Sequence, residues 1–161
     1  GSLDECEWYE PLDDKHFLFW NDGAEHEYIK NSTFPFMMGR ITDPVLAFEG
    51  LCCETENDDS FSFRLTDSFL PENNGIYTVT AKKGQMHIEK EDTAKPERNK
   101  HKPDFTVGAG ALNHLFFGAL SIEELEKLGG LKWQGEEERN EKEEIIHRLL
   151  PPMKNWINEW Y

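Results

Sequence analysis

Cysteine is scarce in this sequence, and its few cysteines do not form a disulfide framework. There are three, an odd number, and Cys52 and Cys53 are adjacent, which is not the arrangement of paired cysteines in small exported domains. No apolar run approaches the roughly 20 residues that cross a bilayer, and no signal peptide precedes the first polar segment. We therefore expect a cytoplasmic protein without a membrane partner.

Positive charge is also in short supply. Seventeen basic residues stand against 32 acidic ones in 161, which gives a formal net charge of −15. A field of this sign repels nucleic-acid backbones and attracts cations, so nucleic-acid binding is not expected. The length suits one domain with a sizeable core. Gly1 and Ser2 resemble a cloning remnant, and we expect the chain to be an excised part of a longer protein.

Alternation of apolar and polar residues predicts strands in the middle of the chain. Phe61, Phe63 and Leu65 alternate with polar neighbours, the period-two pattern of a half-buried strand. Turn residues separate this strand from two more, which predicts an antiparallel meander. Polar segments at 54–60 and 91–103 are expected to be loops. The expected strands are residues 16–20, 27–29, 36–41, 61–66, 76–81, 85–90 and 105–107.

Capping residues predict where helices begin and end. Asp43 can accept hydrogen bonds from the first amides of a helix, and Pro44 suits its first position. Ser121 and Glu124 form a capping box, and Gly129 follows as a stop signal. The expected helices are residues 44–51, 109–117, 122–128 and 136–150.

Candidate metal ligands are absent from the sequence pattern. None of the six histidines stands at ligand spacing from another histidine, a cysteine or an acidic pair. For His114, which falls in an apolar helix, a hydrogen-bonded structural role is favoured. Cys52 and Cys53 are better interpreted as small buried hydrophobic residues than as ligands of a soft metal. We expect no metal site in this chain.

Catalytic groupings are not identifiable either. Gly108 and Gly110 precede a helix, but the third glycine and the parallel βαβ unit of a dinucleotide fingerprint are missing. The acidic pairs at 58–59 and 123–124 are interpreted as solvated surface. No Ser/His/Asp or Cys/His arrangement emerges from residue order. The chain is therefore expected to lack a cofactor site and a complete active site.

Aromatic residues gather at the end of the chain, where most proteins are polar. Met153, Trp156, Ile157 and Trp160 recur at spacings of three and four residues, and Tyr161 follows. Burial of several such side chains contributes a few kcal/mol, since each covers on the order of 150 Å². The pattern predicts a segment that docks, either on its own domain or on a neighbouring one.

Three segments, in the same order, resemble one family. Residues 104–132 read DFTVGAGALNHLFFGALSIEELEKLGGLK. This is similar to the late segment of the N-acetyltransferases typified by the enhanced intracellular survival acetyltransferase, which belong to the GNAT superfamily. There a short strand leads into a Leu-rich helix and then into a capped helix that ends at glycine. The segment after Trp133 matches only loosely, and the polar loop from Glu91 to Pro103 is a departure.

Two upstream segments strengthen the resemblance. FMMGRITDPVLAFEGL is similar to the strand that carries Arg and Asp ahead of a helix, here Arg40 and Asp43. FSFRLTDSFLPENNGIYTV is similar to the family's strand–Asp–Asn-Gly–strand stretch, here Asp67, Asn74 and Gly75.

The resemblance implies an α/β fold of the α+β type. This is a sterol-carrier-like domain, in which helices pack on a mostly antiparallel twisted sheet of about five strands. Residues 34–161 would form this C-terminal domain. Residues 1–33 would be the cloning remnant plus a linker or the end of a preceding GNAT-like domain.

The resemblance also implies a role in catalysis by the parent protein. In the family, the first GNAT domain binds acetyl-CoA, and the chain's terminal carboxylate reaches into that site as general base for a primary amine. Tyr161 would carry this carboxylate, and the fragment would be inactive alone. The implied partners are the upstream GNAT domains and an amine substrate, for which the acidic surface favours polycations. The parent is expected to be a homo-oligomer.

Two alternatives stay open at this point. The fold type also suits a carrier of lipid or another hydrophobic ligand, which requires an apolar tunnel that a sequence does not reveal. The third hypothesis is a scaffold that holds an oligomer together.

Overall fold

The computed structural model describes residues 39–53, 55, 58–91 and 102–153. The strands expected at 16–20 and 27–29 lie outside these ranges, as do residues 92–101 of the polar segment and the aromatic residues from Trp156 onward.

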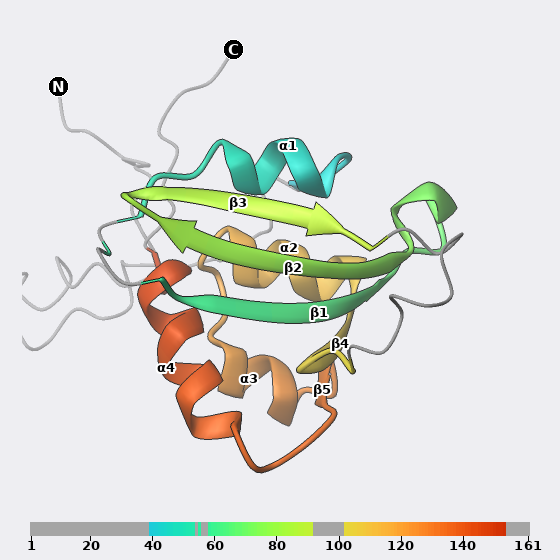
Figure 1. Cartoon of the computed structure of the whole chain (residues 1–161). Helices are drawn as coiled ribbons and strands as arrows, with labels where there is room; N and C mark the ends of the chain where they lie inside the picture. The colour runs from blue at the N-terminus through green and yellow to red at the C-terminus, as the bar shows by residue number, and fades with distance from the viewer. Residues whose placement is uncertain (1–38, 54, 56–57, 92–101, 154–161) are drawn as a thin grey trace, which may run out of the picture. The chain divides into compact units, whose positions relative to one another are not determined.

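A five-stranded sheet is the centre of the described body. The strands are β1 (Ser60–Thr66), β2 (Gly75–Lys82), β3 (Gln85–Lys90), β4 (Phe105–Gly108) and β5 (Leu131–Trp133). They lie in the order β3-β2-β1-β4-β5 (Figure 1). Only the β1–β4 pair of this sheet is parallel, whereas β1–β2, β2–β3 and β4–β5 are antiparallel. The expected mostly antiparallel sheet and the meander β1-β2-β3 are confirmed.

Local sequence explains the hairpin between β2 and β3. Lys83 and Gly84 have φ values of 51° and 81°, the left-handed pair that a tight two-residue hairpin turn requires. Gly84 adopts this conformation without the clash that a side chain brings. The turn sets the register that pairs Val79 with Ile88, and both side chains are buried.

Besides a short 3-10 helix at Pro71–Asn73, four α-helices complete the described body. They are α1 (Pro44–Glu49), α2 (Ala109–Phe116), α3 (Ile122–Lys127) and α4 (Arg139–Leu149). Two of the expected caps are confirmed: Asp43 accepts hydrogen bonds from Val45 and Leu46, and Ser121 and Glu124 form the capping box of α3. The helices contact different strands: α1 contacts β3, α2 contacts β4, α3 contacts β5 and α4 contacts β1.

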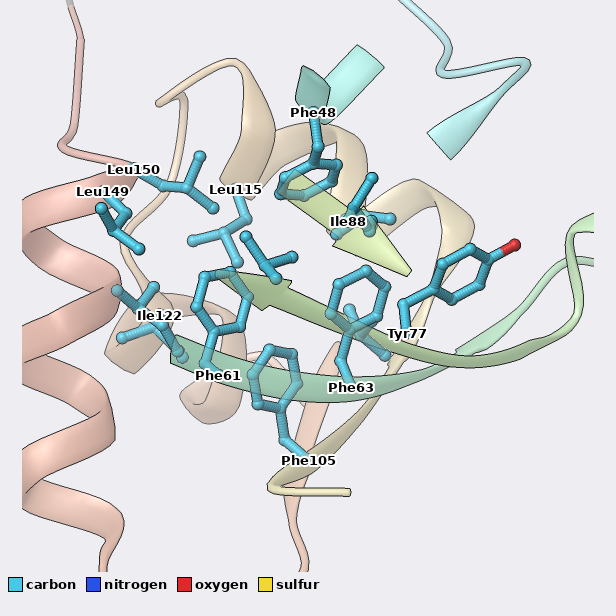
Figure 2. Close-up of a cluster of buried hydrophobic side chains, with 14 of the residues drawn as sticks. Phe48, Phe61, Phe63, Tyr77, Ile88, Phe105, Leu115, Ile122, Leu149 and Leu150 are labelled. Carbon is cyan, nitrogen blue, oxygen red and sulfur yellow. The ribbon is translucent and has the colours of Figure 1, made fainter. Parts of the chain in front are cut away.

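A row of aromatic rings fills the space between the sheet and the helices (Figure 2). The ring of Phe63, which is fully buried, lies within 5.4–5.9 Å of the rings of Tyr77, Phe48 and Phe105, centroid to centroid. Phe61 stacks on the same row at 6.2 Å. Such offset or tilted pairs add to the free energy of burial. Phe63 is therefore the centre of the core.

Ion pairs attach α4 to the rest of the body. Arg148 donates to both carboxylate oxygens of Asp59, at 3.0 and 3.2 Å. His147 contacts Glu123 at 2.5 Å. The interpretation of both acidic pairs as solvated surface was therefore wrong for Asp59, which is buried, and Glu123 is also engaged. Sequence order gave no sign that a basic helix face would cover these acids.

Apart from shifts of one or two residues at the ends of elements, three features differ from expectation. Residues 39–41 of the strand expected at 36–41 are not in a strand, because the Ile41 amide donates to the side chain of Asn113 and not to a neighbouring strand. β5 was not expected, since its three residues are too few to show a period. The last helix begins at Arg139 and not at residue 136, with no side-chain cap to start it earlier.

Truncation of the central ring tests this account of the core. We expect Phe63→Ala to lower the free energy of unfolding by roughly 3–5 kcal/mol, because it removes a buried ring and leaves a cavity. Urea denaturation measures the change. Thr78→Ala, on the other face of the sheet, is the control and should cost far less; equal losses in the two variants would contradict the account.

Candidate functional site

A partly buried ion pair joins two segments that are far apart in the sequence. Nη2 of Arg40 donates to both carboxylate oxygens of Asp67, at 2.6 and 2.7 Å. The Asp67 side chain is 2% exposed, whereas that of Arg40 is 36% exposed. Asn74 accepts a hydrogen bond from the amide of Asp67 through its side-chain oxygen. The structure thus brings together Arg40, Asp67 and Asn74, which the sequence resemblance had singled out.

The turn after β1 holds the carboxylate of Asp67. One of its oxygens accepts hydrogen bonds from the amides of Phe69 and Leu70, both at 2.9 Å. Burial alone would raise the pKa of Asp67, but these two amides and the Arg40 guanidinium outweigh it and hold the pKa below its ordinary value. Asp67 is therefore an ionised, fully engaged carboxylate and is unsuited to act as a general base.

A second layer of hydrogen bonds extends the cluster. The side-chain amide of Asn73 donates to the carbonyl of Thr42 at 3.1 Å, and Oη of Tyr77 donates to the carbonyl of Asn73 at 2.8 Å. Burial, and then the charge of Asp43, raises the pKa of Tyr77. Sequence analysis missed Asn73 and Tyr77 as cluster members, because Asn73-Asn74-Gly75 was interpreted only as a turn. Both layers fasten residues 40–43 to the loop 67–75.

The exposed edge of the cluster is a stacked pair. The guanidinium of Arg40 lies 4.8 Å from the centroid of the Phe69 ring, and Phe69 is 75% exposed. Such a cation–π contact fixes the orientation of the guanidinium. The geometry of the whole cluster is that of a structural brace and not of a reaction centre.

The remaining candidate groups are the histidines, the cysteines and Tyr161. No three histidine, cysteine or acidic side chains among residues 39–53, 55, 58–91 and 102–153 gather as they would around a metal ion. His114 lies on the exposed side of α2, and its hydrogen-bonded structural role stays a prediction. Cys53 is buried as expected, but Cys52 is exposed. Tyr161, the one proposed catalytic residue, lies outside the described residues.

Among the described residues, none of the helices is both long enough and apolar enough to span a bilayer.

The chain matches one protein-family model and is similar in fold to solved structures. The family model described as sterol carrier protein domain matches residues 44–158. No curated protein matches the sequence. The fold is similar to a GCN5-related N-acetyltransferase from Anabaena variabilis, with a TM-score of 0.59 and 14% identity over 73% of this chain. It is also similar to one from Kribbella flavida, with a TM-score of 0.60 and 13% identity over 76% of this chain. The chain spans 26% and 28% of the length of those two proteins.

The ion pair of Arg40 and Asp67 contributes a pH-dependent part of the free energy of unfolding, which can be measured. Because the pKa of Asp67 is lowered in the folded state, its contribution is present above the unfolded pKa of about 3.9 and is lost as the pH falls through the folded pKa. We expect Asp67→Asn to cost about 1–3 kcal/mol at pH 7, with the difference from wild type shrinking below pH 4.

Urea denaturation between pH 7 and pH 3 provides the measurement. Asp58→Asn, which changes an exposed acid, is the matched control and should leave the pH profile unchanged. A constant difference between wild type and Asp67→Asn over the whole range would show that the charge of Asp67 contributes nothing.

Proposed function

The chain belongs to the sterol carrier protein domain family, and we propose that it is the C-terminal accessory domain of a GNAT-type N-acetyltransferase of the enhanced intracellular survival type. The observation that carries this proposal is the shared fold: the chain aligns with about a quarter of two GCN5-related N-acetyltransferases. The remaining length of such proteins has room for the acetyl-transferring domains. We assign residues 34–161 to the accessory domain and residues 1–33 to a cloning remnant plus a linker or the end of the preceding domain.

The chemistry of the described residues agrees with an accessory role. The buried acids Asp59 and Asp67 each accept two hydrogen bonds from an arginine. Despite the burial of Asp67, two backbone amides and the Arg40 guanidinium lower its pKa, so this acid is a poor proton acceptor. In this proposal the reaction takes place in a neighbouring GNAT domain that binds acetyl-CoA.

The terminal carboxylate of Tyr161 is the group that this domain contributes to the reaction. A free α-carboxyl group has a pKa of about 3.5 and is ionised at neutral pH. It can attract an ammonium group and accept its proton while the amine nitrogen attacks the thioester carbonyl. The new C–N bond then forms, the C–S bond breaks, and coenzyme A leaves as its thiol, which takes up the second proton that the nitrogen loses.

Charge indicates the class of acceptor. The net charge of −15 raises the local concentration of cations, so we propose a primary amine, with a preference for polycationic ones. We further propose that the parent protein is a homo-oligomer.

Moving the terminal carboxylate tests its role. We expect one glycine added after Tyr161 in the longer protein to lower kcat about 100-fold, because misplacement by even about 1 Å has that effect on a positioned group. Steady-state acetylation of a primary amine measures it. A glycine added at the N-terminus is the control and should change nothing. Equal turnover by both variants removes Tyr161 from the mechanism.

A carrier of a lipid or other hydrophobic ligand remains the second candidate, and the family match favours it. In the described core, rings at 5.2–6.2 Å fill the space between the sheet and the helices, where an acyl chain would need a tunnel. We therefore expect that this chain does not bind a fluorescent fatty acid. Saturable micromolar binding would favour the carrier instead.

A further inference from the structure

One face of the five-stranded sheet is left uncovered by the described helices. Side chains of α1, α2, α3 and α4 all join the core on the side of Phe61 and Phe63. The alternate residues of each strand point to the opposite side, which we call the open face. It includes Ser62, Arg64, Thr78, Lys82, Thr106 and Lys132. These residues are polar or charged, so the open face suits water or a polar partner.

Two cations of the open face stand in one row across the sheet. Arg64 of β1 is opposite Thr106 of β4, which in turn is opposite Lys132 of β5. The Cα atoms of Arg64 and Lys132 are therefore two strand spacings apart, or about 10 Å. Both residues are exposed. A single partner surface can contact both of them at once.

Neither cation is paired within the described part of the chain. The arginines of α4 each bind an acid: Arg139 binds Glu126 and Arg148 binds Asp59. By contrast, the side chains of Arg64 and Lys132 form no hydrogen bond or ion pair among the described residues. The acids of the helix side are therefore matched with cations, whereas this row of the open face keeps its positive charge.

The acids of the open face do not neutralise this row. Glu89 is exposed, but it belongs to β3, which lies two strands from Arg64. The carboxylate of Asp104 accepts hydrogen bonds from the amide and the hydroxyl of Ser62, at 2.6 and 2.9 Å. The row can therefore accept carboxylates from another molecule.

Unpaired acids gather elsewhere on the same body, at the start of α4. Glu137, Glu138 and Glu141 are exposed, and their side chains form no hydrogen bond or ion pair among the described residues. The helix that follows packs on the core side of the sheet through Ile145 and Ile146. The chain thus carries a positive row and a negative segment that do not pair within one copy.

The shape and size of the open face indicate what kind of partner fits. Small-molecule sites are concave, whereas a sheet surface of five strands is broad, about 24 Å across. Covering it would bury on the order of 1,000 Å² in total, the lower limit for a specific protein contact. At an ionic strength of ~0.1 M, repulsion between two net charges of the same sign is screened beyond about 10 Å, while ion pairs in contact persist.

We propose that the open face docks on a second copy of this chain: Arg64 and Lys132 of one copy pair with Glu137, Glu138 and Glu141 of the next. The two surfaces differ, so the contact is heterologous and can close into a ring. Its small area makes it a weak contact. The proposal concerns this chain itself and does not depend on acetyl transfer, so its failure would leave the proposed function untouched.

A charge exchange between the two surfaces tests the contact. Sedimentation velocity of this chain over a wide range of concentrations, at ~0.1 M salt, measures the association constant. We expect Arg64→Glu to lower this constant at least about tenfold, because like charges then face each other. Glu141→Arg should lower it as well. The double variant Arg64→Glu/Glu141→Arg should recover most of the loss, since it restores one opposite pair.

Lys127→Glu is the matched control. Lys127 is an exposed cation of α3 that has no ion pair among the described residues, and its replacement changes the net charge by the same amount. It should associate as well as wild type. Urea denaturation reports whether each variant is folded, and Lys132→Glu replaces Arg64→Glu if the latter does not fold.

Three results would overturn the proposal. The first is a wild-type chain that stays monomeric at every concentration. The second is an equal loss in Lys127→Glu, or no loss in any charge variant, because the open face would then not be the contact. The third is a double variant that associates no better than Arg64→Glu alone, because the start of α4 would then not be the partner surface.

Discussion

The two ends of β1 hold the described body together. Asp59 immediately precedes this strand and Asp67 immediately follows it, and these are the buried acids of the described residues. Each accepts two hydrogen bonds from an arginine: Asp67 from Arg40, near the start of the described chain, and Asp59 from Arg148, near its end. β1 thus holds both the segment at Arg40 and the segment at Arg148 through ion pairs at its two ends.

The same strand organises the core. Phe61 and Phe63 point from β1 into the row of rings, while its neighbours β2 and β4 supply Tyr77 and Phe105. An ionised carboxylate next to such a core is stable only if its partners are supplied in full, since a lone buried charge is costly. This requirement explains why Asp67 is braced by an arginine and two amides, and Asp59 by an arginine. The two ion pairs attach the segments around Arg40 and Arg148 to the ends of β1.

Local patterns were sufficient to predict most of this fold. The alternation at Phe61–Leu65, the cap at Asp43 and the capping box at Ser121 each act within a few residues, so the sequence displays them directly. The contacts that matter most join residues far apart in the chain: Arg40 to Asp67, Asp59 to Arg148 and Gly118 to Met153. No period or motif marks such pairs. Gly118 lies within the segment 104–132 that carries the resemblance, but its close approach to the Pro151–Met153 backbone needed coordinates.

We propose that this domain contributes the terminal carboxylate to an acetyl transfer that takes place in another domain of a longer protein. The most direct test measures acetyl-CoA binding and amine acetylation for this chain alone and for the longer protein, under identical conditions. The account predicts that the longer protein binds acetyl-CoA and acetylates amines, while the chain alone does neither. Acetyl transfer by the chain alone, or none by the longer protein, would contradict it.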